Sequence, residues 1–116
     1  MKDSVTMTLL YDYYGELLTE KQRCCFDLYY NQDYSLAEIA AEEGISRQGV
    51  HDSIARAAAL LKNFEEKIGC LARAAQVHQA LEEITTAAER IQTSGDGTVR
   101  SLAGDILRAA ASIKEY

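Results

Sequence analysis

Five side chains near the middle of the chain have the types and spacing that suit contact with a nucleic acid: Ser46, Arg47, Gln48, His51 and Arg56. An arginine side chain can bind guanine or a phosphate, and a glutamine amide can bind adenine. A serine at the start of a helix, beside the unpaired backbone N–H groups there, suits a phosphate. His51 can add a positive charge to this set. The chemistry that these residues predict is recognition of a nucleic acid.

The elements that must position these residues form a helix-turn-helix. A capping box at residues 35–38 opens a helix that we expect to reach about Glu43. Gly44 stops this helix, because glycine readily adopts the left-handed conformation of a helix end. Ser46 then caps a second helix, whose apolar residues at 50, 54, 57, 61 and 64 are spaced by four and three. A short helix, a glycine turn and a second helix are the parts of a helix-turn-helix.

The same geometry also serves in proteins as a packing unit that holds another protein, so the fold is more strongly indicated than nucleic-acid contact. Residues 35–63 carry three basic and four acidic side chains, a net charge of −1. Asp52 precedes Arg56 by four residues, and the two side chains can pair on the helix surface. Both observations keep a protein-interaction module open as an interpretation.

The composition describes one soluble domain with a helical appendage. The chain has 116 residues, of which 47% are hydrophobic and 26% charged, and it has no proline to interrupt long helices. The net charge of −6 excludes a protein that coats DNA without specificity, because such a protein needs a basic surface. Any nucleic-acid contact must therefore come from a local patch.

Enzyme, metal and membrane functions find no support in the residue pattern. There is no nucleophile–base constellation and no glycine-rich phosphate loop, so we expect no enzyme and no cofactor. Cys24, Cys25 and Cys70 lack the spacing of a zinc site or a disulfide framework, and we expect the adjacent pair to fill the core. Without a signal peptide or a long apolar run, we expect a reduced, cytoplasmic protein that does not insert into membranes.

The remaining pattern predicts further helices and no strand, and hence an all-α fold. The expected helices cover residues 5–14, 19–30, 64–92, where Gly69 either breaks the helix or only weakens it, and 98–114, after a loop at 93–97. We therefore predict a helix-turn-helix domain over residues 1–63 and a C-terminal helical extension over residues 64–116. The extension is long for what it can bury alone, and its alanines allow close helix contact. These features predict a homodimer.

Four segments of the chain form a distinctive set: residues 14–23 (YGELLTEKQR), residues 28–30 (LYY), residues 33–40 (DYSLAEIA) and residues 45–50 (ISRQGV), with Asp52 and Ile54 following. Together they resemble the YlxM family, a group of small bacterial helix-turn-helix proteins associated with the signal recognition particle. The resemblance covers about residues 7–68. Gly49 stands where the family usually has alanine, and the alanine-rich part from Cys70 onwards does not match residue by residue.

This resemblance implies an all-helical, dimeric protein with a three-helix core similar to region 4 of sigma factors, a winged-helix-type core without the wing. It also implies a role as regulator or accessory component of the signal recognition particle of a Gram-positive-type bacterium, with contact to the particle's RNA or protein. One alternative is a sequence-specific transcriptional regulator that uses the same helix on DNA. The other is the protein-interaction module without nucleic-acid contact.

Overall fold

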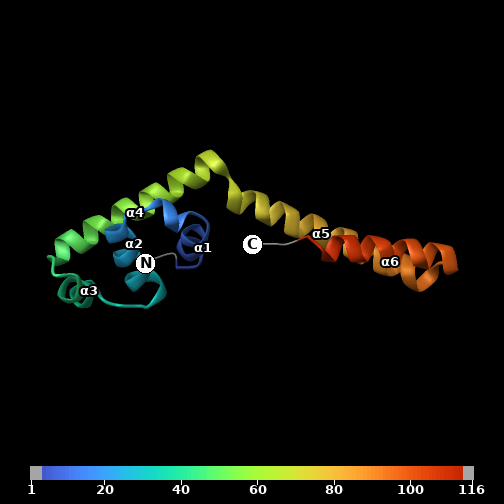
Figure 1. Ribbon diagram of the computed structural model, residues 1–116, viewed down its shortest axis with the longest axis horizontal. Coiled ribbons are helices and arrows are strands. Elements are labelled where there is room, and N and C mark those ends of the chain that lie inside the picture. Colours follow the sequence, from blue (N-terminus) through green and yellow to red (C-terminus); the bar gives the residue numbers. More distant parts are fainter. Residues whose placement is uncertain (1–3, 114–116) are drawn as a thin grey trace. The chain divides into compact units, whose positions relative to one another are not determined.

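The computed structural model describes residues 4–113, and every regular element in that range is helical (Figure 1). The six α-helices are α1 (Ser4–Tyr14), α2 (Glu20–Phe26), α3 (Leu36–Glu43), α4 (Arg47–Ile68), α5 (Cys70–Ser94) and α6 (Gly97–Ala111). A short 3₁₀ helix, η1 (Gly15–Leu17), follows α1, and a π-helical turn, η2 (Asp27–Asn31), follows α2. The predicted all-α fold is confirmed.

The chain divides into two compact units, Met1–Leu71 and Ala72–Tyr116. The domain boundary that the sequence predicts, between residues 63 and 64, lies inside α4, which continues to Ile68. Among residues 4–113, no helix is long and apolar enough to cross a membrane.

Both predicted capping boxes are present, and they explain where α2 and α3 begin. The Thr19 hydroxyl accepts the backbone N–H of Gln22 at 3.2 Å, and the Gln22 side chain accepts the backbone N–H of Thr19 at 3.0 Å. Ser35 and Glu38 make the same reciprocal pair at 3.1 and 3.0 Å. Each box satisfies two donors that a helix start would otherwise leave unpaired.

The helix predicted over residues 19–30 changes its winding after Phe26. From Asp27 the chain follows the wider π turn, in which the backbone N–H of Gln32 reaches the carbonyl oxygen of Asp27 at 3.1 Å. The Asp27 carboxylate also accepts hydrogen bonds from the side-chain amides of Asn31 and Gln32, both at 2.7 Å. These side-chain contacts hold the turn open, and hydrophobic periodicity carries no signal for them.

Gly69 ends α4 and does not merely weaken it. Its φ of 73° lies in the left-handed region, and its N–H bonds to the carbonyl oxygen of Glu65 at 2.8 Å. The first turn of α5 is then tied back to α1 and α4. The Tyr14 hydroxyl donates to Glu65 Oε1 at 2.7 Å and accepts the backbone N–H of Cys70 at 2.9 Å, while Glu65 Oε1 also accepts the N–H of Leu71 at 2.9 Å.

The core of the first unit has two parts, and α2 and α4 contribute residues to both. One part joins α1, α2 and α4 around Phe26, whose ring stacks on Tyr11 with a centroid distance of 5.2 Å. The other joins α2, α3 and α4 around Cys25, Ile39 and Val50, all fully buried. The expectation that both adjacent cysteines fill the core is wrong for Cys24, which is exposed because neighbouring helix positions point about 100° apart.

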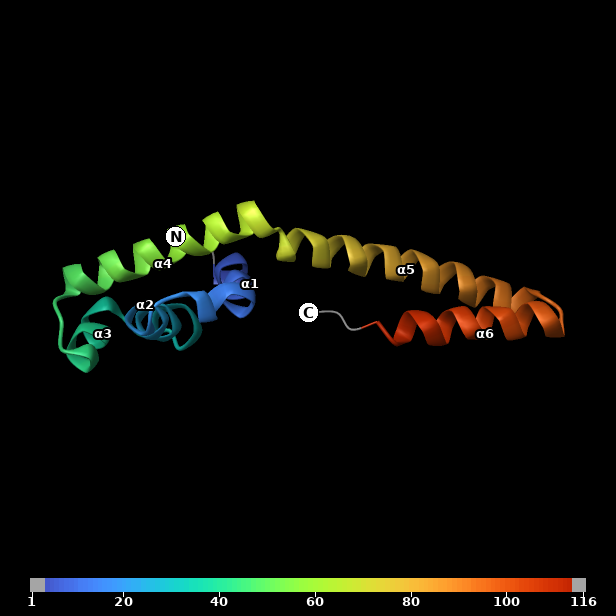
Figure 2. The same ribbon diagram turned by 45° about the horizontal axis from the view of Figure 1, so that its top comes forward.

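The second unit is a helical hairpin in which α6 runs back along α5 (Figures 1 and 2). The loop between them is short, because α5 reaches Ser94 and Asp96 already caps α6 by accepting the N–H of Val99 at 2.9 Å. The helix α6 ends at Ala111; Lys114, to which the sequence predicts the last helix, lies outside the described residues. The buried hydrophobic residues of this unit are Leu81, Ala88 and Ala103 among those described.

Candidate nucleic-acid interface

The turn between α3 and α4 is fixed by local hydrogen bonds. Gly44 has a φ of 69° and ψ of 31°, and its N–H bonds to the carbonyl oxygen of Ala40 at 3.0 Å. The N–H of Ile45 reaches the same oxygen at 3.2 Å, and the Ile45 side chain packs against the second core cluster. This left-handed C-cap directs the chain from α3 into α4.

Buried residues of α4 determine which of its side chains face outwards. Val50, Ile54, Ala57 and Leu61 are buried, as the spacing predicts. At the start of the helix, Ser46, Arg47, Gln48, His51 and Asp52 are all exposed. The Ser46 hydroxyl is the N-cap, because it accepts the N–H of Gly49 at 3.0 Å. Four of the five predicted residues therefore lie together at the exposed N-terminal end of α4: Ser46, Arg47, Gln48 and His51.

Arg56 lies apart from this group. It follows Arg47 by nine residues, and at about 100° per residue the two side chains leave α4 in roughly opposite directions. Lys62 follows Arg47 by fifteen residues and returns to within about 60° of it. The exposed Lys62 is therefore better aligned with Arg47 than Arg56 is, and helical periodicity in the sequence already contains this signal.

Asp52 has partners other than the predicted Arg56. The Gln48 side-chain amide donates to Asp52 Oδ1 at 2.9 Å, and His51 Nδ1 lies 3.5 Å from the same oxygen. No ion pair joins Asp52 to Arg56 in the described part of the chain, so the pairing that their spacing allows is not formed. One N–H of the Gln48 amide, the group that would bind adenine, is thus engaged within α4, whereas the amide has a second N–H and an acceptor oxygen.

Two shallow depressions meet at the exposed start of α4. The first is lined by Arg47, Gln48 and His51 of α4 and by residues 35–37 at the start of α3. The second is apolar and is lined by Tyr29, Tyr30, Leu36, His51, Ile54, Ala55 and Ala58. Leu36 and His51 belong to both. The apolar depression was not predicted from the sequence, although the adjacent Tyr29 and Tyr30 could have indicated it.

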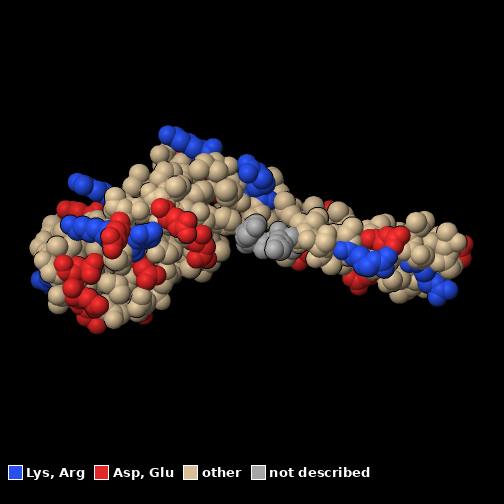
Figure 3. Space-filling model, in the orientation of Figure 1, with Lys and Arg blue, Asp and Glu red and all other residues tan. Residues whose placement is uncertain are grey.

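Charge is unevenly distributed in the first unit. Residues 1–71 contain seven basic and twelve acidic side chains, a net charge of −5. In Figure 3, Lys and Arg side chains project along the outer edge of α4, whereas Asp and Glu gather over α2 and α3. The exposed Arg47, Arg56 and Lys62 therefore make α4 locally basic on an acidic unit.

The described residues contain no group of three or more His, Cys, Asp or Glu placed to hold a metal ion. Three groups with a shifted pKa belong to the core or to a helix cap. Burial and the hydrogen bond to Glu65 raise the pKa of Tyr14 well above its ordinary value, and burial raises the pKa of the Cys25 thiol. The backbone and side chain of Ser35 lower the pKa of Glu38 through the capping box. None of these groups lies at the exposed start of α4.

A comparison with known protein families shows which family this chain belongs to. The family described as "Putative helix-turn-helix protein, YlxM / p13 like" (UPF0122) matches residues 1–98. This chain belongs to the UPF0122 family. The match extends past Cys70 through α5 to the start of α6, beyond the segments that carry the resemblance in the sequence. The family is described by its helix-turn-helix and by no catalytic activity.

Curated UPF0122 proteins from several bacteria are similar over most of the chain. The protein of Thermoanaerobacter sp. (strain X514) is 49% identical over 90 residues, which cover 78% of this chain and 77% of the relative. That of Symbiobacterium thermophilum is 43% identical over 94 residues, 81% of this chain and 88% of the relative. That of Halalkalibacterium halodurans is 43% identical over 91 residues, 78% and 84% of the two chains.

Proposed function

We propose that this UPF0122 member is a non-enzymatic, cytoplasmic helix-turn-helix protein that binds RNA through the exposed start of α4 and serves the signal recognition particle as a regulator or accessory component. The observation that carries RNA contact is the placement of Ser46, Arg47, Gln48 and His51 together at a capped helix start. The association with the particle is supported by the family resemblance to YlxM.

The geometry gives each residue of this face a role. Arg47 is exposed at the first position of α4 and can reach a phosphate or a guanine edge. Ser46 keeps the first turn in place, and the backbone N–H groups of that turn attract an anion. His51 and Lys62 extend the basic face along the helix. Arg56, on another side of α4, is left for a contact with a different part of the ligand.

A specific observation favours one second candidate, a protein-interaction module. The apolar depression at Tyr29, Tyr30 and Ile54 adjoins the basic helix start, and the hydrogen bond to Asp52 occupies one donor of Gln48. A protein partner could place an apolar side chain in the depression and an acidic side chain next to the basic helix start. A DNA-binding regulator would use the same residues as the proposed RNA contact.

The test is a titration of the purified chain with the RNA of the signal recognition particle and with a DNA duplex of similar length, followed by fluorescence anisotropy. Arg47→Ala should weaken RNA binding by about 5- to 100-fold, because a lost arginine contact costs about 1–3 kcal/mol. Arg100→Ala, an exposed arginine of α6, is the matched control and should change little. Equal or tighter binding of DNA would favour the transcriptional regulator.

A pull-down of the tagged chain from its own cytosol tests the partner. Half of the sample is treated with ribonuclease before washing. Recovery of the particle's GTPase only in the untreated half supports RNA as the link. Recovery in both halves, with no loss in Arg47→Ala, supports the protein-interaction module, and recovery of DNA without any particle component contradicts the proposal.

A further inference from the structure

The apolar depression beside the start of α4 has no role in the RNA contact described so far. It lies between the π turn η2, which contributes Tyr29 and Tyr30, and α4, which contributes His51, Ala55 and Ala58 among others. Its volume is about 210 Å³, whereas pockets that enclose a whole small molecule measure roughly 300–1,000 Å³. A hollow of this size suits one flat ring and not a complete cofactor.

The tyrosine wall of the apolar depression is held in place from the core. The rings of Tyr29 and Tyr30 meet edge to face, at an interplanar angle of 88° and a centroid distance of 5.1 Å. Tyr30 also packs on the buried Phe26 at 4.5 Å. The turn that carries both tyrosines is fixed by the two side-chain hydrogen bonds to Asp27. A ligand therefore meets ring surfaces that are already ordered, and less entropy is lost on binding.

Small side chains form much of the α4 wall. Ala55 and Ala58 line the depression, and at 100° per residue they lie only about 80° and 20° around the helix from Arg47. The exposed Lys62 follows Ala58 by one turn and continues the same strip of the helix surface. Arg47 and Lys62 are about 22 Å apart along the axis. The strip thus places a hollow between two cations, so that a chain of linked phosphates can pair with both.

The distribution of charge indicates what kind of ligand fits. Residues 1–71 contain twelve acidic side chains, yet among the described residues none of them lines either depression at the start of α4. Asp52 contacts His51 but belongs to neither lining. The charged residue of the linings is Arg47, and His51 adds a positive charge when it is protonated. This arrangement fits a ligand whose aromatic ring is joined to a phosphate.

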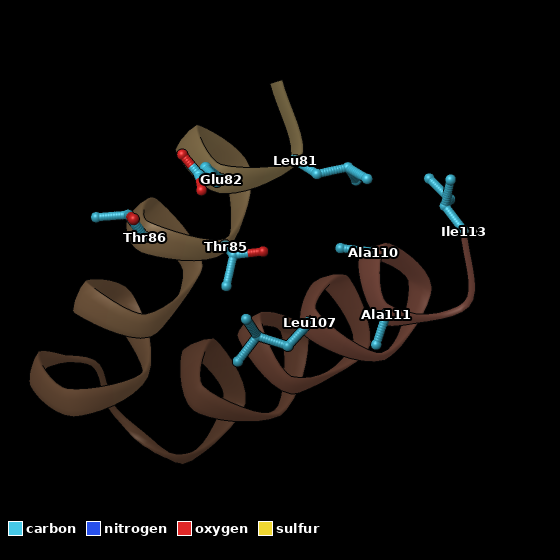
Figure 4. A pocket seen from close by; sticks show the side chains of 8 residues that line it. All are labelled: Leu81, Glu82, Thr85, Thr86, Leu107, Ala110, Ala111 and Ile113. Carbon is cyan, nitrogen blue, oxygen red and sulfur yellow. The ribbon is translucent and has the colours of Figure 1, made fainter. Parts of the chain in front are cut away.

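A hollow in the second unit lacks these features (Figure 4). It lies between α5 and α6, where Leu81, Thr85 and Leu107 face it and Glu82 is its charged side chain. The described residues that line it include no aromatic and no basic side chain. A base would find no ring to stack on there, and a phosphate would meet a carboxylate. The combination of aromatic and basic groups therefore distinguishes the depression beside α4.

The shape of RNA explains why a ring-sized hollow beside α4 is useful. The major groove of an RNA duplex is deep and narrow, so side chains cannot read base edges there as they do in DNA. Proteins that recognise RNA instead bind bases that are unpaired in loops, bulges and ends, and they stack these bases on aromatic side chains. A helix start that binds RNA thus needs a place for an unpaired base close by.

We propose that the apolar depression takes one unpaired base of the RNA, which stacks on the Tyr29 ring while neighbouring phosphates pair with Arg47 and Lys62. This inference rests on the proposed RNA contact and adds the class of RNA, which is a bulge or a loop and not a continuous duplex. Every base has a face that can stack, so the depression selects the structure of the RNA and not its sequence. Selection of sequence falls to Arg47 and Gln48 in the neighbouring depression.

The test is a set of fluorescence anisotropy titrations of the full chain with three RNA hairpins. One contains a single bulged adenosine, the second has an abasic residue at the bulge, and the third is fully paired. The bulged RNA should bind at least about 5-fold more tightly than the abasic RNA, because a base stacked on an aromatic ring contributes at least that much. Both carry the same phosphates, so electrostatic attraction does not separate them. Equal affinity for the two would overturn the proposal.

Substitutions in the depression test its location. Ala55→Leu fills the depression and should abolish the preference for the bulged RNA, whereas Ala59→Leu, at an exposed position of α4 outside the lining, is the matched control. Tyr29→Leu should weaken binding of the bulged RNA at least about 5-fold, and Tyr29→Phe, which keeps the ring, should retain it. Circular dichroism verifies that the helices persist. If Tyr29→Leu unfolds, the comparison of Ala55→Leu with Ala59→Leu still decides.

The outcomes separate this inference from the proposed function. If Arg47→Ala weakens binding of every RNA while Ala55→Leu behaves like Ala59→Leu, the RNA contact stands and the base site is wrong. If no RNA binds at all, both proposals fail. If Ala55→Leu spares binding of the bulged RNA but prevents recovery of a protein partner after ribonuclease treatment, the depression holds an apolar side chain of that partner, and the inference is overturned.

Discussion

At the scale of single residues, the exposed start of α4 combines groups that attract a nucleic acid with one group that opposes it. Asp52 places a carboxylate next to His51 and holds the Gln48 amide at 2.9 Å. The arrangement keeps Gln48 ordered and occupies one of its two N–H donors. The side chains of this short segment therefore determine how tightly and how selectively we expect it to bind RNA.

Replacing Asp52 by Asn should strengthen RNA binding by about 3- to 10-fold. The change removes a negative charge from the binding face, and an amide holds Gln48 less firmly than a carboxylate does. Anisotropy titrations measure the effect, and Glu66→Gln, an exposed carboxylate farther along α4, is the control. Unchanged or weaker binding of Asp52→Asn would show that Asp52 does not oppose the ligand.

Tyr14→Phe should lower the free energy of unfolding by about 1–3 kcal/mol, because Glu65 loses a donor and the Cys70 N–H loses its acceptor. Urea unfolding measures this, with Tyr34→Phe as the control at a partly buried ring. The raised pKa of Tyr14 means that its contribution is complete below the ordinary value of 10.0 and is lost as the pH rises above it. Tyr14→Phe should therefore flatten the alkaline loss of stability, and an unchanged alkaline profile would contradict this role.

At the scale of elements, the sequence was most informative about helix ends that are fixed by hydrogen bonds between residues close in the chain. The starts of α2, α3 and α4 follow from hydroxyl caps at Thr19, Ser35 and Ser46, and the end of α3 follows from Gly44, because each involves residues a few positions apart. The π turn after Phe26 was not predictable, since it depends on how Asp27 meets Asn31 and Gln32.

The limits of prediction at the candidate site have similar physical causes. Ser46, Arg47, Gln48 and His51 share an exposed helix start because the Ser46 cap and the buried stripe of α4 place them there, and the sequence contains both signals. The partner of Asp52 could not be predicted, because positions 48 and 56 are both four residues from it and spacing alone does not choose between them. Gly69 was ambiguous for a related reason: a glycine inside an apolar repeat is compatible with a helix that continues and with one that ends.

Gly44→Ala should destabilise the first unit by about 1–2 kcal/mol, because its φ of 69° strains any residue with a Cβ, although no atom lies within 4 Å. Gly97→Ala is the matched control. Its surroundings are equally open and its φ is ordinary, so alanine there should be neutral or slightly stabilising. Thermal unfolding distinguishes the two, and equal effects would exclude backbone strain as the cause.

At the scale of the whole molecule, the two units divide the charge unevenly between them. The first carries a net charge of −5 around a locally basic helix, and the second is almost neutral. This distribution leaves α4 as the locally basic element of an acidic unit. It also limits how many phosphates the protein can neutralise.

The salt dependence of RNA binding should therefore be shallow. With Arg47, His51 and Lys62 as the aligned basic groups, we expect about two or three phosphate contacts, and hence a slope of log K against log salt near −2, since single strands give about −0.7 for each phosphate. Titrations between about 50 and 300 mM salt determine this slope. A slope steeper than about −5 would require a basic surface elsewhere on the molecule.

The aromatic residues of the first core have an optical consequence. The chain has no tryptophan, six of its seven tyrosines precede residue 35, and both phenylalanines lie before residue 65. Tyrosine emission and near-ultraviolet dichroism thus report almost entirely on the helix-turn-helix unit, around the stacked rings of Phe26 and Tyr11. Far-ultraviolet dichroism reports on all helices, including the hairpin. Recording both signals during one denaturation resolves the melting of each unit within the intact chain, with no label and no truncation.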